Sequence, residues 1–204
     1  QNHPVAATFF KNAAQEGKTL IIMDPRRQAL SRHADHMLQF TPGRDVPLLN
    51  AMIHTIIEEG LTDENYIKGY TEGYEDLKAK VKDFSPEKMA EICGIDAETI
   101  RTVARKYATA ERSIIFWGMG ISQHVHGTDN ARCLIALSLM TGNIGRPGTG
   151  LHPLRGQNNV QGASDAGLIP MMFPDYRRVD DNDASEFFSQ YWNASLDKIP
   201  GLTV

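Results

Sequence analysis

The densest group of ligand-type side chains lies between Leu154 and Asp165. This stretch of twelve residues holds one guanidinium group, four side-chain amides and two glycines. Amides offer paired donors and acceptors that match the edges of a heterocycle, and glycines let a backbone approach a ligand closely. The guanidinium of Arg155 suits bidentate binding of a carboxylate or phosphate. We therefore favour a ligand-binding loop here over a polar surface loop with glycine turns.

Three further polar or glycine-rich segments follow stretches that predict strands. Short runs of branched or apolar residues at 19–23, 37–40 and 113–117 each lead into a loop. Strands that alternate with helices predict an α/β fold, a Rossmann-like parallel sheet flanked by helices. Binding sites in such sheets form at the carboxyl ends of the strands. We expect three loops to converge on one rim, namely Asp24–Pro25–Arg26, Pro42–Gly43–Arg44–Asp45 and Gly118–Met119–Gly120.

The remaining chain is organised around this sheet. Successive helix-start residues predict a cluster of short helices inserted at about 63–108; they are Asp63, Gly73, Ser85 and Asp96. Weak periodicity predicts an irregular active-site loop at about 146–176. We expect a single cofactor-binding domain over 1–176, then an acidic tail, 177–204, with one short helix. The chain begins without Met and stops in an apolar run, so we expect a longer protein whose next domain follows the tail.

Composition excludes two classes of partner. A net charge of -4 gives no electrostatic footprint for nucleic acid, and no apolar window is long enough to span a membrane. Cys93 and Cys133 lie far apart within helical patterns, so we interpret them as small buried hydrophobes of a cytoplasmic, reducing compartment. His124 and His126 lie two residues apart without a third ligand nearby, so we predict no metal site in this chain.

The loop with Arg155 resembles the RGQNNVQG-x-x-D loop of molybdenum and tungsten formate dehydrogenases. Other segments resemble that family in the same order along the chain; they are Asn2–Val5, Asp24–Arg27, Ala34–Asp35, Pro42–Asp45, Trp117–Gly120 with Gln123, and Leu139–Gly145. Later residues, Gly167–Pro170 and Phe173–Tyr176, look most like soluble, NAD-linked members. The chain is similar to an internal part of the catalytic alpha subunit, which carries two molybdopterin guanine dinucleotides.

The resemblance implies a role for individual residues. Arg155 would bind formate, because a fixed guanidinium suits a bare carboxylate. Nine residues would contact the cofactor; they are Asp24, Pro25, Arg26, Gly43, Asp45, Met119, Gln123, Asn143 and Gln157. Plainer structural interpretations exist for three of these, because Asp24 suits an Asx turn, Asp45 a helix cap and Asn143 a helix end.

The resemblance also implies the reaction and its partners. Formate would be oxidised to carbon dioxide at a molybdenum or tungsten centre, and electrons would leave through iron–sulfur clusters outside this chain. Further partners would be the other domains of the catalytic subunit and electron-transfer subunits of the NAD-linked diaphorase type. The metal-ligating Cys or selenocysteine of the family lies upstream of the position that matches Gln1. We therefore expect the isolated polypeptide to bind no cofactor and to be inactive.

Three alternatives remain open at this point. The first is a nitrate reductase-like molybdopterin oxidoreductase, against which the residues Arg155–Asn159 argue. The second is a non-catalytic, electron-conducting relative like the pterin-free large iron–sulfur subunit of the NADH:quinone oxidoreductase, in which ligand loops would be degenerate. The third is an excised folding unit without a cofactor. The sequence does not encode the choice between molybdenum and tungsten, the electron acceptor or the oligomeric state.

Overall fold

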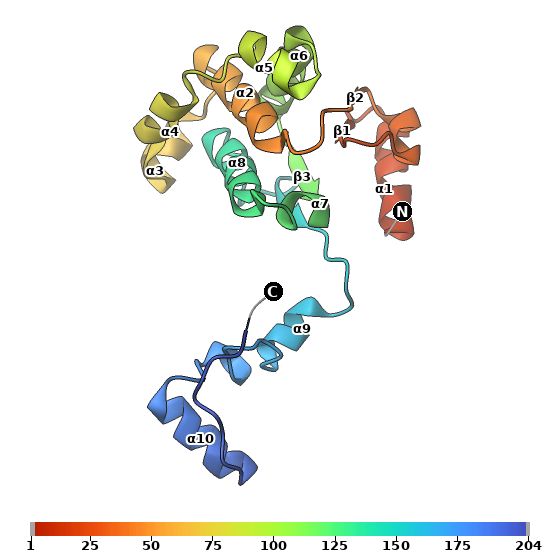
Figure 1. Ribbon diagram of the computed structural model, residues 1–204. Helices are drawn as coiled ribbons and strands as arrows, with labels where there is room; N and C mark the ends of the chain where they lie inside the picture. Colours follow the sequence, from red (N-terminus) through yellow and green to blue (C-terminus); the bar gives the residue numbers. More distant parts are fainter. Residues whose placement is uncertain (1–2, 203–204) are drawn as a thin grey trace. The chain divides into compact units, whose positions relative to one another are not determined.

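The computed structural model describes residues 3–202, and the chain divides into two compact units (Figure 1). Unit 1 extends to Leu154 and unit 2 begins at Arg155. This division lies earlier than the expected domain end at Tyr176. The reason is that Phe173 packs with Val179 and Phe188 in a separate small core, so the segment after Leu154 folds with the tail.

Unit 1 contains four short strands in two parallel pairs. β1 (Ile21–Met23) pairs with β2 (His36–Leu38), and β3 (Ile114–Trp117) pairs with β4 (Gly150–Pro153). The three expected strands and their parallel direction are confirmed. The fourth strand was not predicted, because Gly-Leu-His-Pro has no strand pattern and its pairing with β3 is a long-range contact. The two pairs remain separate two-stranded sheets.

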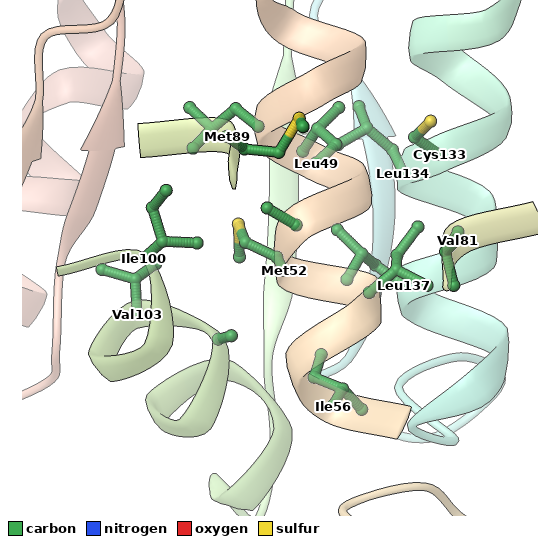
Figure 2. Packing of buried hydrophobic residues seen from close by; sticks show 14 of the residues in the cluster. Leu49, Met52, Ile56, Val81, Met89, Ile100, Val103, Cys133, Leu134 and Leu137 are labelled. Atoms are coloured by element: carbon green, nitrogen blue, oxygen red, sulfur yellow. The ribbon is translucent and has the colours of Figure 1, made fainter. Parts of the chain in front are cut away.

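Helix α2 (Asp45–Glu58) forms the centre of unit 1. Its apolar residues recur at helical spacing, and Leu48, Ile53 and Ile56 are fully buried. Around it pack α5 (Pro86–Cys93), α6 (Ala97–Thr109) and α8 (Gly127–Met140). Figure 2 shows how Met52 and Leu49 of α2 meet Leu134 and Leu137 of α8 and the side chains of α5 and α6. The β-strands contribute Ile21, Ile115 and Leu151, among others, to the edge of the same core.

The expected cluster of short helices at 63–108 is confirmed. It comprises α3 (Glu64–Tyr70), α4 (Tyr74–Val81), α5 and α6. The carboxylate of Asp63 accepts from the Tyr66 amide at 2.9 Å, and that of Asp96 accepts from the Thr99 amide at 2.8 Å. Each side chain satisfies a backbone donor that the first helical turn leaves without a partner. Local sequence therefore sets the helix starts in this region.

The remaining helices of unit 1 lie before or beside the strands. α1 (Pro4–Gln15) precedes β1 and has no fully buried residue. The 3-10 helix η1 (Ala29–His33) connects β1 to β2. Helix α7 (Met119–Ser122) is a single turn after β3. Among the helices of residues 3–202, none is long and apolar enough to cross a bilayer.

Unit 2 is small and contains α9 (Val160–Asp165), the 3-10 helix η2 (Pro174–Tyr176) and α10 (Asn182–Trp192). The short helix expected in the tail is α10. Its start is capped by Asp181, whose Oδ1 accepts from the Ala184 amide at 3.0 Å. The buried apolar residues of this unit are Phe173, Val179, Ala184 and Phe188.

Candidate functional site

The first predicted loop begins where β1 ends. The Asp24 amide donates to the Leu38 carbonyl at 3.2 Å, so this loop starts beside the end of β2. Oδ1 of Asp24 accepts from the Arg26 amide at 2.7 Å, and Oδ2 accepts from Nε2 of Gln28 at 2.9 Å. This is the Asx turn that Asp before Pro favours. Because a carboxylate oxygen can accept more than one hydrogen bond, the turn holds Asp24 in place without using all of its acceptors.

The second predicted loop follows β2. The Thr41 amide donates to the Cys93 carbonyl at 2.8 Å, which fixes the loop to α5. Gly43 has a φ of 77°, a left-handed conformation that favours glycine. Arg44 occupies the N-cap position of α2, and Asp45 is the first helical residue. Asp45 is buried and negatively charged at a helix N-terminus, where the helix dipole stabilises an anion.

The third predicted loop is the α7 turn, residues Gly118–Gln123. The Gln123 amide donates to the Met119 carbonyl at 2.7 Å and closes the turn. Two residues of α8 hold it from behind. Nδ2 of Asn130 donates to the Ile121 carbonyl at 3.0 Å, and Gly127 lies so close that a Cβ there would overlap the Ser122 carbonyl. The α7 turn is therefore rigidly attached to the core helix α8.

His124 brings the second and third loops together. Its Nε2 lies 3.8 Å from Oδ2 of Asp45. Its Cε1 lies 4.0 Å from the position that a Cβ on Gly43 would occupy. In the sequence, His124 stands out only as one of two histidines without a third metal ligand nearby. No pattern in the sequence pairs it with Asp45, because 79 residues separate the two and only folding brings them into contact.

Asn143 is not among the residues that the structure brings to this rim. Its Oδ1 accepts from the Ser113 amide at 3.0 Å, and its Nδ2 donates to Oγ1 of Thr141 at 3.0 Å. Ser113 precedes β3, so these bonds lie at the amino end of that strand. The side chain is 1% exposed and joins the end of α8 to β3. A structural role accounts for it, and the cofactor contact stays a prediction.

The amide-rich loop lies in unit 2, between Arg155 and α9. Asn159 is left-handed, and its Oδ1 caps α9 by accepting from the Gly162 amide at 3.2 Å. A Cβ at Gly162 would lie 2.5 Å from Nδ2 of Asn159, so this cap requires glycine. Nε2 of Gln161 donates to Asp165 at 2.8 Å and to the Tyr176 hydroxyl at 3.1 Å.

The four amides of this loop therefore separate into two pairs. Asn159 and Gln161 hold the loop and α9 in shape. Gln157 and Asn158 are exposed, as is Arg155. Gln157 and Asn158 are thus the two amides of this loop whose side chains neither cap α9 nor form hydrogen bonds within it.

The two thiols belong to the core. Burial raises the pKa of the Cys93 thiol to about 11 and that of Cys133 to about 11. A thiol with so high a pKa stays protonated at neutral pH and is neither nucleophile nor metal ligand. The expected burial of both residues is confirmed. Among the residues that the structure describes, no cluster of His, Cys, Asp and Glu could hold a metal ion.

The loops of unit 1 leave space and polar groups beside the α7 turn. A Cβ at Gly120 would meet no atom within 4 Å, so there is open space above the α7 turn. Exposed side chains beside the loops carry a guanidinium on Arg26 and an amide on Gln123. Oδ1 of Asn130 is buried behind the turn with no hydrogen-bond partner. Cationic and amide donors suit a diphosphate and a heterocycle.

Similar proteins match this chain over nearly its whole length. The alpha subunit of the F420-dependent formate dehydrogenase of Methanocaldococcus jannaschii is 45% identical over 204 residues, which is 100% of this chain and 30% of that protein. Formate dehydrogenase H of Escherichia coli is 40% identical over 202 residues, 99% of this chain and 28% of that protein. This chain thus spans less than a third of the length of these relatives.

A solved structure has a similar fold. Acetylene hydratase from Pelobacter acetylenicus matches with a TM-score of 0.65 and 32% sequence identity, over 68% of this chain and 19% of its own. The family model for molybdopterin oxidoreductases matches residues 1–196. Because that match covers nearly all of the sequence, this chain belongs to the molybdopterin oxidoreductase family.

Proposed function

We propose that this chain is the part of a formate dehydrogenase catalytic subunit that binds formate and one side of a molybdopterin guanine dinucleotide. The observation that carries the proposal is the segment Arg155–Asn158. It exposes a guanidinium and two amides, and it precedes a helix whose cap, Asn159, fixes where the segment ends. Relatives that match the full length of the chain are formate dehydrogenases by name, which supports the same substrate.

The loops of unit 1 would hold the cofactor. Asp24 would accept from the ring N–H and amino group of guanine, and Arg26 would face the diphosphate. Gly43 and Asp45 would form a second nucleotide contact, and Met119 and Gln123 would touch a pterin. When bound, the cofactor and its molybdenum or tungsten ion supply two-electron redox chemistry. Iron–sulfur clusters would belong to parts of the longer protein outside this chain.

Arg155 would orient the substrate. A planar guanidinium donates two parallel hydrogen bonds to a carboxylate, which fixes both the position and the direction of formate. Holding the C–H bond in one direction lowers the entropic part of the barrier. Gln157 would line the same pocket or contact a pterin. The isolated 204-residue polypeptide would still be inactive, so formate-dependent dye reduction by this chain alone would contradict the proposal.

The electron acceptor and the location depend on the longer protein. NAD-linkage rests on the resemblance of Gly167–Pro170 and Phe173–Tyr176 to NAD-linked members. It has no support in the names of the similar proteins, because several of these are F420-dependent. Assays of the full-length protein with NAD and with F420 as the acceptor would distinguish NAD-linkage from F420-dependence. The NAD assay would include the diaphorase-type partner that NAD-linkage requires. A cytoplasmic location likewise stays a prediction from thiol chemistry.

The Arg155→Lys variant of the full-length enzyme tests the proposal. Lys keeps the charge but not the planar fork, so we expect kcat/KM for formate to fall by about 10²–10³-fold, the loss typical of removing one fixed donor. Arg132→Lys is the matched control, because Arg132 is exposed on α8 and pairs only with Asp129 at 3.6 Å. An unchanged kcat/KM for formate in Arg155→Lys would contradict the formate-binding role of Arg155.

Nitrate reduction is the second function to test. The nitrate reductase of Synechocystis is 35% identical over 187 residues of the chain. An enzyme that reduces nitrate with a reduced dye and leaves formate untouched would replace the formate proposal with this one. The same samples serve both assays, since both require the assembled cofactor.

A further inference from the structure

His124 lies between two loops that the proposed function assigns to different parts of the cofactor. Its Nε2 faces Asp45 at 3.8 Å, beyond a hydrogen bond but within ion-pair reach. Its Nδ1 is 3.4 Å from the His126 amide and accepts from it. A ring that accepts at Nδ1 carries its proton at Nε2 when neutral. The Nε2–H therefore faces the Asp45 carboxylate.

The surroundings favour this orientation. The His124 side chain is 27% exposed, and the Asp45 side chain is 8% exposed. A largely buried carboxylate needs donors, because an unsatisfied buried charge is costly. The ring also lies beside Gly43, since its Cε1 is 4.0 Å from the position of a Cβ on that residue. The His124 imidazole thus lies beside both Gly43 and the Asp45 carboxylate of the second loop.

We propose that His124 is a positioning residue that fastens the α7 turn to the Pro42–Asp45 loop and so sets the spacing of two cofactor contacts. The inference rests on the proposed function for the identity of the ligand. The α7 turn is already held to α8 by Asn130 and Gly127. The second loop is held to α5 through Thr41. The pair of His124 and Asp45 adds a direct side-chain contact between the two loops.

The test measures cofactor retention in the full-length holoenzyme. Gln can place its amide N–H where Nε2–H lies, whereas Asn reaches only the Nδ1 position, and Ala offers no donor. We expect His124→Ala and His124→Asn to release the cofactor about tenfold faster, the lower end of the effect of removing a residue that supports a ligand contact. His124→Gln should stay within about twofold of the wild type. The readout is released pterin, measured by its fluorescence after oxidation, together with metal per protein.

Two controls separate positioning from general stability. His126→Ala removes a nearby imidazole whose side chain is 62% exposed and pairs only with Asp129 at 3.8 Å, and it should retain cofactor normally. In an Asp45→Asn background, His124→Ala should cause no further loss, because the partner of Nε2–H has lost its charge. A structural defect unrelated to Asp45 would instead add its effect to that of Asp45→Asn.

Several results would overturn the inference. They are normal retention in His124→Ala, equal loss in His124→Gln and His124→Ala, or loss in His126→Ala. If His124→Ala does not fold, His124→Asn gives the same comparison with a polar side chain. Retention is measured without formate, so the outcome does not depend on Arg155. If His124→Asn loses cofactor while Arg155→Lys keeps normal formate efficiency, the formate-binding role of Arg155 is rejected. The positioning role of His124 is then kept.

Discussion

Unit 1 and unit 2 hold their loops in different ways. In unit 1, the three loops predicted to bind the cofactor extend from strands and helices around a core of nineteen buried apolar residues. Unit 2 has four such residues, so the loop with Arg155 depends on short-range hydrogen bonds and helix caps. Small cores contribute little stability. The difference teaches that the loops predicted to bind the cofactor are fixed by the fold, whereas the loop with Arg155 is fixed by its own sequence.

The small core of unit 2 is mainly aromatic. The ring centroids of Phe173 and Phe188 lie 4.9 Å apart, and those of Phe188 and Trp192 lie 4.8 Å apart. The guanidinium of Arg177 lies 5.6 Å from the centre of the Phe188 ring. Phe188 is therefore the residue on which the packing of this unit depends. Aromatic pairs and a cation–π contact each add of the order of 1 kcal/mol to the burial of these rings.

The largest expected effect on stability comes from truncating one buried side chain in each core. Phe188→Ala should cost about 3–5 kcal/mol and Leu137→Ala about 2–5 kcal/mol. We expect Phe188→Ala to remove the hydrogen-exchange protection of α10 while α2 and α8 keep theirs. Leu137→Ala should lower protection throughout unit 1, because its core is shared. Peptide-resolved hydrogen exchange of the full-length protein measures both, and equal loss in α2 and α10 on Phe188→Ala would break the comparison.

A smaller effect is expected from glycines at the α7 turn. Gly127→Ala would force a Cβ into the Ser122 carbonyl, and overpacking of this kind costs about 1–3 kcal/mol. The turn should be displaced, with weaker protection at 118–127 and faster cofactor release. Gly120→Ala is the control, since its Cβ meets nothing within 4 Å, and it should leave the stability of the turn nearly unchanged. Equal loss of hydrogen-exchange protection at 118–127 in both variants would show that the core does not fix this loop.

The smallest effect concerns an ion-pair cluster formed by the carboxyl end of α2, the first turn of α5 and the middle of α6. Arg101 pairs with Glu58 at 3.0 Å and with Glu87 at 2.9 Å, and Arg105 pairs with Glu59 at 2.7 Å. Arg105, assisted by Arg101, holds the pKa of Glu59 below its ordinary value. The pKa of Glu87 is lowered first by its own backbone N–H and then by Arg101.

These lowered pKa values fix the sign of the pH dependence. A carboxylate with a lower pKa in the folded state stabilises the fold above its ordinary pKa, 4.5, and this contribution is lost as the pH falls through the folded pKa. Arg101→Gln should cost about 1 kcal/mol near neutral pH, because solvent screens these pairs. The deficit should shrink below the ordinary pKa. Chemical denaturation from neutral pH to below the ordinary pKa measures the unfolding free energy that Arg101→Gln loses, with Arg132→Gln as control. A loss that stays constant with pH would contradict the ion-pair explanation.

The sequence by itself determined the local elements and the family. The branched run before Asp24 predicted β1, and Asp63 and Asp96 predicted helix starts that their caps confirm. These features depend on neighbours within a few residues, so a linear pattern contains them. The order of the motifs along the chain also pointed to the molybdopterin oxidoreductases, the family whose model matches residues 1–196.

Tertiary structure alone decided which of these residues meet. The pairing of β4 with β3, the contact of His124 with Asp45 and the burial of Asn143 all join segments far apart along the chain. Such contacts depend on how helices pack around α2, and no local periodicity in the sequence predicts them. For the loop with Arg155, the structure separated Asn159 and Gln161, whose amides form hydrogen bonds, from the exposed Gln157 and Asn158, because only the folded chain shows which amide groups are already used.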